Sequence, residues 1–242
     1  MTVESNRDAV SNPAALQLSP AESVTRRDAV IDQIKRGIVL GTIKPGEKLT
    51  ESALSTALGV SRPTVREALN QVAQEGLLIH EPYRRLRVAD LDAAAVLDMA
   101  DVRVALDMQA ATDIIADTSG SRMKAIDAVW EVYERNALAE DFLVQHESHL
   151  AFHRGIWAAS GNSFLMRLWP VTAAHMTIAL ARDQATRQDP QRAYEMHLNL
   201  IEAIHSRDLE CIHTALVEHT VDSARELVAL MSDGSTDRPI RF

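Results

Sequence analysis

The spacing of apolar residues changes along the chain. Residues 1–22 show little periodicity and contain Asn-Pro and Ser-Pro pairs, so we expect a disordered N-terminal arm. Residues 23–89 combine short helical patterns with two short strand patterns. From residue 90 to residue 232 the strand patterns vanish and amphipathic helical patterns follow one another. The last residues, 233–242, are expected to form a flexible tail.

Residues 23–89 predict three helices followed by a hairpin. The helices begin near Arg26, after Thr50 and after Ser61, and the last two follow a residue type that is preferred as an N-cap. Pro63 fits the first turn of the third helix, where a missing N–H costs nothing. Two short β patterns then flank a Pro-Tyr pair, which predicts a hairpin. This order of elements is typical of a winged helix-turn-helix.

Residues 90–232 predict an all-α antiparallel bundle with short connections. The helical patterns cover about residues 93–117, 122–138, 141–159, 163–185, 190–206 and 208–231. The expected fold class is therefore mainly α: an N-terminal winged helix-turn-helix with a small β-hairpin wing, followed by an all-α antiparallel helical bundle.

Composition excludes several classes of protein. Of 242 residues, 46% are hydrophobic, which is too many for a disordered chain. The longest uncharged stretches fall well short of the roughly 20 residues that a membrane span requires, so no membrane partner is expected. A single cysteine, Cys211, cannot form an internal disulfide, which favours the reducing cytoplasm. We expect a cytoplasmic globular protein.

The net charge of −9 is unevenly distributed. Residues 23–89 contain 11 basic and 7 acidic side chains, whereas residues 90–242 contain 13 basic and 24 acidic ones. A uniformly acidic protein would repel nucleic acid, but a small basic module on an acidic body can still bind it. Chance clustering of charge is the alternative explanation of the count alone.

The third predicted helix has the residues of a DNA-recognition helix. Ser61, Arg62 and Thr64 lie in its first turn, and Arg66 follows Arg62 by four residues on the same face. An arginine fork fits guanine O6 and N7, and hydroxyl groups suit phosphate oxygens. An ordinary solvated helix face would have the same residue types, so these residues alone leave both interpretations open.

Four histidines lie on predicted core faces of the bundle. His149 and His153 are four residues apart on one helix, and His197 and His219 lie in the apolar stripes of two others. A lone histidine on an apolar face is usually a structural core residue. Four converging imidazoles need more partners than a core offers, and one metal ion would satisfy all of them.

The N-terminal segment resembles the DNA-binding domain of GntR-family transcription regulators. The resemblance rests on KPGEKLTESAL at residues 44–54 and GVSRPTVREAL at residues 59–69, and it extends from about residue 30 to residue 88. It implies that Arg62, Thr64 and Arg66 contact DNA and that Ser61 contacts the phosphate backbone.

The wing departs from the GntR pattern. The family usually has a glycine between its two wing strands, whereas this chain has Pro-Tyr-Arg-Arg there. Arg84 and Arg85 are expected to contact the minor groove or the DNA backbone. Phosphate steering without base contacts is the alternative role for these arginines.

The bundle resembles the FCD-type (FadR-like) ligand-binding domain over about residues 93–230. The motifs are HLAFHRGIWAASGN at residues 149–162, MHLNLIEAI at residues 196–204 and EHT at residues 218–220. Metal-binding members hold a divalent ion with an aspartate and three histidines. The matching positions here are those of the four histidines, and His149 stands where the family has aspartate. Four neutral imidazoles favour Zn²⁺ or Ni²⁺ over harder ions.

The same resemblance implies a small organic acid as effector. Family ligands are generally small carboxylates that coordinate the metal and meet an arginine, and Arg103 matches that position. A guanidinium suits a bidentate carboxylate pair. The alternative for Arg103 is an exposed salt bridge with Asp107 at i+4.

The sequence therefore predicts a homodimeric, ligand-responsive regulator of transcription that binds double-stranded operator DNA, with a repressor as the expected mode. A metal-free regulator with an apolar acyl ligand is one alternative. A metallohydrolase is another, but Glu147 and Glu218 are expected to point away from the histidines, and no nucleophile motif is visible. No enzymatic activity is expected.

Overall fold

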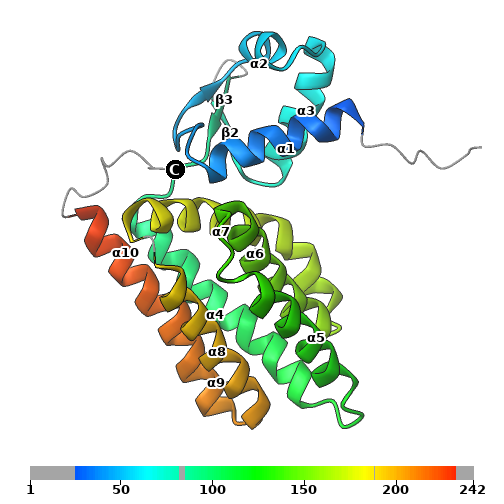
Figure 1. The fold of residues 1–242 in the computed structure, drawn as a ribbon, viewed down its shortest axis with the longest axis vertical. Helices are drawn as coiled ribbons and strands as arrows, with labels where there is room; N and C mark the ends of the chain where they lie inside the picture. Colours follow the sequence, from blue (N-terminus) through cyan, green and yellow to red (C-terminus); the bar gives the residue numbers. More distant parts are fainter. Residues whose placement is uncertain (1–24, 82–84, 188, 233–242) are drawn as a thin grey trace, which may run out of the picture.

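The computed structural model of the protein describes residues 25–81, 85–187 and 189–232, which form a small head above a helical bundle (Figure 1). The expected arm at residues 1–22 and the expected tail at residues 233–242 lie outside the described residues. The predicted fold class is confirmed, since helices make up most of the described chain and the strands are confined to the head.

The head contains three helices and a three-stranded antiparallel sheet. Its elements are α1 (Arg26–Val39), β1 (Lys48–Leu49), α2 (Glu51–Leu58), α3 (Arg62–Gln74), β2 (Leu78–Glu81) and β3 (Arg85–Val88). The strand order is β1-β3-β2, and β2 with β3 forms the expected hairpin. Strand β1 is not among the predicted elements, because two residues are too few to show the alternation of a strand.

Side-chain caps begin the two helices of the helix-turn-helix. The Thr50 hydroxyl accepts a hydrogen bond from the backbone N–H of Ala53, and the Ser61 hydroxyl accepts one from Thr64. Between the helices Gly59 adopts φ +64°, which a residue with a Cβ rarely tolerates. Both predicted caps are confirmed, and together with this turn they orient α3.

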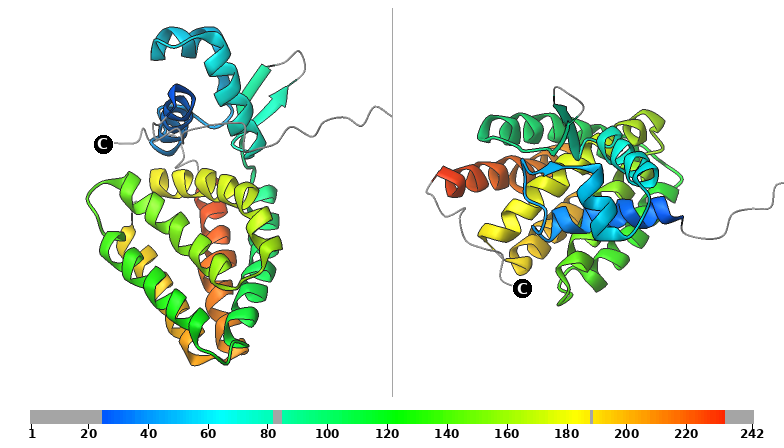
Figure 2. Two further views of the ribbon diagram at one scale, coloured as in Figure 1. Left: turned by 90° about the vertical axis from the view of Figure 1, so that its right-hand side faces the viewer. Right: turned by 90° about the horizontal axis from the view of Figure 1, so that it is seen from above.

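The bundle is built from long helices that lie side by side (Figures 1 and 2). Its elements are α4 (Ala93–Ile115), α5 (Ser121–Asn136), α6 (Phe142–Ala159), α7 (Ser163–Thr186), α8 (Pro190–Ser206), α9 (Leu209–Leu216), the π-helical segment η2 (Val217–Asp222) and α10 (Ser223–Ser232). The long α-helical pattern expected over residues 208–231 is thus interrupted by η2. Apolar periodicity cannot distinguish a wide turn inside a helix from a continuous α-helix.

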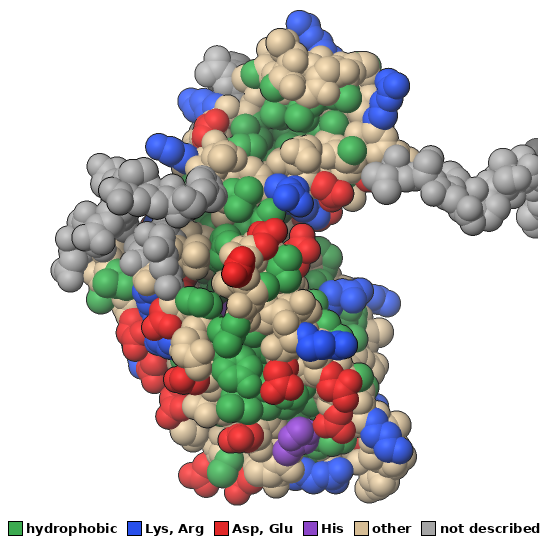
Figure 3. Space-filling view, in the orientation of Figure 1, with side chains coloured by type: hydrophobic (Ala, Val, Ile, Leu, Met, Phe, Trp, Pro, Cys, Tyr) green, Lys and Arg blue, Asp and Glu red, His purple; other side chains and the backbone are tan. Residues whose placement is uncertain are grey.

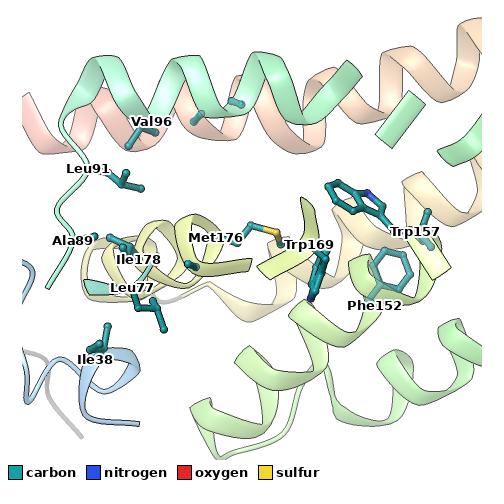
Figure 4. Close-up of a cluster of buried hydrophobic side chains, with 14 of the residues drawn as sticks. Ile38, Leu77, Ala89, Leu91, Val96, Phe152, Trp157, Trp169, Met176 and Ile178 are labelled. Carbon is teal, nitrogen blue, oxygen red and sulfur yellow. The ribbon is translucent and has the colours of Figure 1, made fainter. Parts of the chain in front are cut away.

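Head and bundle share one buried apolar cluster (Figure 4). Ile38 and Leu77 belong to the head, Ala89 and Leu91 to the connecting segment, and Ile178 to α7. The helices α1 and α7 pack against each other directly. The head is therefore docked on the bundle through apolar contacts as well as through the chain connection.

One segment of the described chain, Ser163–Gln184 in α7, is long and apolar enough to cross a membrane by length and composition alone. It contains Pro170 and packs against α4 and α6 inside the bundle. Core helices of water-soluble proteins pass the same test, so this segment is weak evidence for a membrane span.

Candidate recognition helix and candidate metal centre

The helix α3 has two faces with different environments. Val65 and Leu69 are essentially inaccessible to solvent, while Arg62 and Arg66 are exposed on the opposite side. Ser61 caps the helix and leaves its positive N-terminal end exposed. Since the helix end and the two arginines all favour an anion, this face has the chemistry to bind a phosphate backbone.

The hydroxyl groups of Ser61 and Thr64 are hydrogen-bonded to each other over 2.8 Å. Ser61 is exposed and Thr64 is half-buried. Each hydroxyl can still form a further hydrogen bond, since it is both a donor and an acceptor. Their predicted DNA contacts stay predictions.

The side chain of Arg66 is held by Glu51, which the sequence analysis did not single out. Arg66 Nε donates to Oε1 of Glu51 over 2.7 Å, and Nη2 donates to Oε2 over 2.8 Å. This bidentate pair joins the first turn of α2 to α3. Glu51 is separated from Arg66 by fifteen residues, so no helical spacing in the sequence indicates the pair.

The wing is only partly described. Arg84 lies outside the described residues, and for Arg85 the structure describes the backbone, which pairs with Glu81 across the β2–β3 hairpin. The predicted DNA contacts of both arginines stay predictions. On the face shown in Figure 3, basic side chains are spread over the head, and the bundle has both acidic and basic side chains.

All four predicted histidines meet in the bundle. His149 and His153 come from α6, His197 from α8 and His219 from η2. One ring nitrogen of each lies within 4.8 Å of the others. Nε2 of His153 is 3.2 Å from Nε2 of His197 and 3.0 Å from Nε2 of His219. The structure thus brings together the residues that spacing and resemblance pointed to.

The proton positions in this cluster suit a cation. Nδ1 of His197 lies 2.6 Å from the carbonyl oxygen of Ala193, which can only accept, so Nδ1 holds the proton and Nε2 has the lone pair. Nε2 of His153 can share a proton with His197 or with His219, but not with both. A divalent ion would accept lone pairs from all these nitrogens together, so the residues fit a metal.

Burial keeps these imidazoles neutral. It lowers the pKa of His197 to about 3, with the Ala193 carbonyl opposing part of that shift. Burial is also the main reason that the pKa values of His149, His153 and His219 lie well below the ordinary value. Neutral imidazole is the form that binds a metal, so the cluster needs no proton release near neutral pH.

The π-helical segment places His219. Residues 217–222 form wider turns than the α-helices on either side, and His219 lies in their middle with 8% exposure. A π-bulge inserts one extra residue and rotates the following side chains, and such bulges are frequent at functional sites. Here the segment lies against α4 and α8.

Arg103 is buried with its partner rather than exposed. Its Nε lies 3.2 Å from Oδ2 of Asp107, and both side chains are less than a tenth exposed. Trp157 donates from Nε1 to Oδ1 of the same aspartate over 2.5 Å. The predicted i+4 salt bridge therefore forms, but inside the bundle, where it can also face a ligand.

A cavity of about 110 Å³ joins Arg103 to the histidine cluster. His149, His197 and His219 line it, together with apolar side chains of α4 and α7. Arg103 and Thr220 line it as well, and each has a buried atom without a hydrogen-bond partner among the described residues, Nη2 of Arg103 and Oγ1 of Thr220. Such orphaned polar atoms favour a bound polar ligand.

One further buried histidine lies outside the predicted set. His146, one helical turn before His149 on α6, is 4% exposed, and burial lowers its pKa to about 4. It lines a larger cavity of about 510 Å³ between α1 of the head and α6 and α7 of the bundle. Its place in this second cavity separates it from the four clustered histidines.

The comparison with known proteins separates the chain into the same two parts. Residues 26–88 match the family described as bacterial regulatory proteins, gntR family. Residues 98–222 match the FCD domain, which is more than half of the chain.

Similar proteins agree with this division. The chain is 27% identical over 199 residues to a protein named as the D-xylose utilization operon transcriptional repressor of Paenarthrobacter nicotinovorans, covering 80% of this chain and 86% of that protein. It is 27% identical over 185 residues to the HTH-type transcriptional repressor GlaR of Escherichia coli, covering 72% of this chain and 83% of that protein. The solved structure of E. coli McbR/YncC has the same fold, with a TM-score of 0.65 and 18% identity, and covers 88% of this chain and 100% of that one. The chain belongs to the GntR family of DNA-binding transcription regulators and contains an FCD domain.

Proposed function

We propose that the protein is a homodimeric repressor in the cytoplasm whose operator binding is modulated by a small carboxylate at a metal-containing pocket of the bundle. The single observation that supports this most is the convergence of His149, His153, His197 and His219 beside Arg103. DNA binding follows from the family, whereas the dimer, the metal and the effector are our proposal. The predicted boundaries, with the DNA-binding part at 23–89 and the ligand part at 90–232, belong to the same proposal.

In the proposed complex the two α3 helices of the dimer occupy successive major grooves. Half-sites of a palindromic operator would then lie about 34 Å apart, one turn of DNA. Arg62 and Arg66 would contact base edges, and Ser61 and Thr64 would contact phosphates. This assignment is supported by the exposure of both arginines and by the buried apolar face that orients them.

In the bundle the four imidazoles would hold one divalent ion, with Zn²⁺ or Ni²⁺ favoured by nitrogen ligands. The bound ion would supply a Lewis-acid position for a carboxylate oxygen. Arg103 would bind the same ligand through Nη2, which has no partner within the described residues. The charge of Arg103 is held in place by Asp107, and Trp157 in turn fixes that aspartate.

The proposed switch uses the helix that links the two parts. Arg103 lies on α4, and α4 begins five residues after the last strand of the head ends. A ligand that binds more tightly to one position of α4 would therefore bias the orientation of the head. The head is connected to the bundle in two ways: by the chain that runs into α4, and by the packing of α1 on α7. A shift in the bundle can act on the head through both.

Two alternatives remain as outcomes of the test. The apolar lining of the cavity would favour a metal-free regulator with an apolar acyl ligand, although its volume of about 110 Å³ allows only a small one. A hydrolase would need a general base beside the cluster, and both Glu147 and Glu218 are exposed.

The test is native mass spectrometry of the purified protein against its denatured mass. We expect a dimer with one extra ion per chain, and loss of that ion in His153→Ala. The control is His213→Ala, an exposed histidine on α9, which should retain the ion. A metal-free dimer after incubation with zinc or nickel would overturn the metal site and direct the search to apolar ligands.

A further inference from the structure

The charged side chains around the histidine cavity comprise equal numbers of positive and negative groups. Each charged residue that lines the cavity lies within 3.2 Å of an opposite charge. Arg103 pairs with Asp107. The other four, Asp183, Arg187, Glu226 and Arg192, form one network in which Glu226 contacts both arginines. Before an ion enters, these six side chains contribute no net charge to the cavity.

The cluster itself adds no negative charge. All four of its members are imidazoles, and within the described chain no carboxylate belongs to the group whose ligand atoms lie within 4.8 Å of one another. The four ligands would therefore leave the +2 charge of a bound divalent ion uncompensated. In a buried site such a charge is costly unless a counter-ion accompanies it.

The cavity restricts what that counter-ion can be. Its volume of about 110 Å³ is below the roughly 300–1,000 Å³ of most ligand pockets, so it suits a small molecule. Two of the residues that line it, Arg103 and Thr220, each have a buried donor without a partner among the described residues, Nη2 and Oγ1. A small molecule with two anionic groups can place one group toward the cluster and the other toward these donors.

We propose that the pocket selects small dianions over monoanions of the same shape, and that His149 sets this requirement by supplying a neutral imidazole. This inference rests on the metal-binding function proposed above. A carboxylate at position 149 would cancel one charge of the ion, so a monoanion would then suffice. The neighbouring residues would be unchanged, which makes position 149 a specificity-determining one.

The experiment uses matched pairs of ligands that differ in one charge. Isothermal titration calorimetry measures the affinity of the Zn²⁺-loaded full-length protein for oxalate and oxamate, for malonate and malonamate, and for succinate and succinamate. For the pair that fits best we expect the dianion to bind about tenfold more tightly or better, since one unit charge acts at short range in a partly buried site.

Two variants of equal shape, His149→Asp and His149→Asn, test whether the charge at position 149 sets the preference for the dianion. In His149→Asp the preference for the dianion should fall by about tenfold, because the new carboxylate neutralises part of the ion. In His149→Asn, which has the same shape without the charge, the preference should persist. Chelation of Zn²⁺ by the ligands in solution is the same for every protein, so differences between the variants report the site.

The possible failures are distinguishable by measuring bound metal first. If native mass spectrometry finds no ion in the wild type, the proposed metal site fails and the inference fails with it. If the ion is bound but dianions and their monoamides bind equally in all three pairs, or none of them binds, the metal site stands and the inference is wrong. Identical preferences in the Asp and Asn variants would also overturn the role of His149.

Discussion

Two arginine–carboxylate pairs show how differently the head and the bundle use the same chemistry. Arg66 with Glu51 lies on the head, and the arginine side chain is 62% exposed. Arg103 with Asp107 lies inside the bundle, and its arginine is 8% exposed. An exposed pair contributes little to stability because water screens it, whereas a buried pair cannot lose one partner without leaving a buried charge. The candidate DNA contact on the head is therefore free to change partners, whereas the candidate ligand contact in the bundle is fixed by its aspartate.

Removing one partner of the buried pair should have the largest effect. In Asp107→Ala the Arg103 guanidinium remains buried without its counter-charge, and Trp157 loses its acceptor. We expect a loss of about 3–5 kcal/mol in the free energy of unfolding, measured by urea denaturation. The exposed pair of Arg225 with Asp222 is the control, and Asp222→Ala should cost less than about 1 kcal/mol. Similar losses of unfolding free energy in Asp107→Ala and Asp222→Ala would contradict the difference between buried and exposed pairs.

Truncating the exposed arginine should affect DNA binding and leave stability nearly unchanged. We expect Arg66→Ala to weaken binding by about 1–3 kcal/mol if this side chain contacts a base. Fluorescence anisotropy measures this with a duplex that the wild-type protein selects from a random pool. Arg225→Ala, an exposed arginine on α10, is the control and should bind as the wild type does. Unchanged DNA binding in Arg66→Ala would contradict the proposal that Arg66 contacts a base.

The buried histidines make the bundle sensitive to acid in the absence of metal. Burial lowers the pKa of His146 to about 4 and that of His197 to about 3, while an unfolded imidazole keeps its ordinary value near 6.5. Acid therefore protonates the unfolded chain first, and stability should fall as pH decreases from 6.5 toward 4. Each such histidine contributes about 1 kcal/mol between pH 7.5 and pH 5.5.

Urea denaturation of the metal-free protein across this pH range measures the effect. His146→Leu should flatten the dependence, because it removes one buried group that titrates only in the unfolded chain. His213→Asn, at an exposed position, should keep the wild-type slope. A slope that is equal in both variants would contradict the prediction.

The smallest expected effect concerns the partner of Arg66. Glu51→Gln removes a negative charge beside α3 and leaves one acceptor oxygen for Nε and Nη2 of the arginine in place of two. We expect affinity for a scrambled duplex to rise by a few-fold, consistent with the ~0.2–1 kcal/mol of a surface pair, and discrimination of the selected duplex to fall. Glu67→Gln removes the same charge from α3 itself and is the control. If both variants change discrimination equally, the pair has no specific role.

Local patterns predicted the head well because its determinants are close together in the sequence. Thr50 and Ser61 cap their helices through residues three positions away, and the hairpin strands flank their own turn. The exceptions depend on distant partners. Strand β1 pairs with β3 almost forty residues later, and Glu51 reaches Arg66 across the helix-turn-helix.

In the bundle the sequence predicted which histidines point inward but not how they are held. Spacing of three and four residues placed each imidazole on an apolar stripe. It could not predict the π-helical segment that contains His219, since periodicity tolerates one extra residue in a turn. It also left the environment of Arg103 open, because a pair at i+4 forms equally well in water and in a core.

The sequence by itself determined the fold class, the position of the candidate recognition helix and the inward faces of the four histidines, because caps, turns and helical periodicity act over a few residues. Only the tertiary structure decided that the imidazoles from α6, α8 and η2 converge within 4.8 Å, that Arg103 is buried beside them, and that the surrounding positive and negative side chains are equal in number. Those features depend on how separate helices pack, and packing is set by the whole apolar core rather than by any one segment.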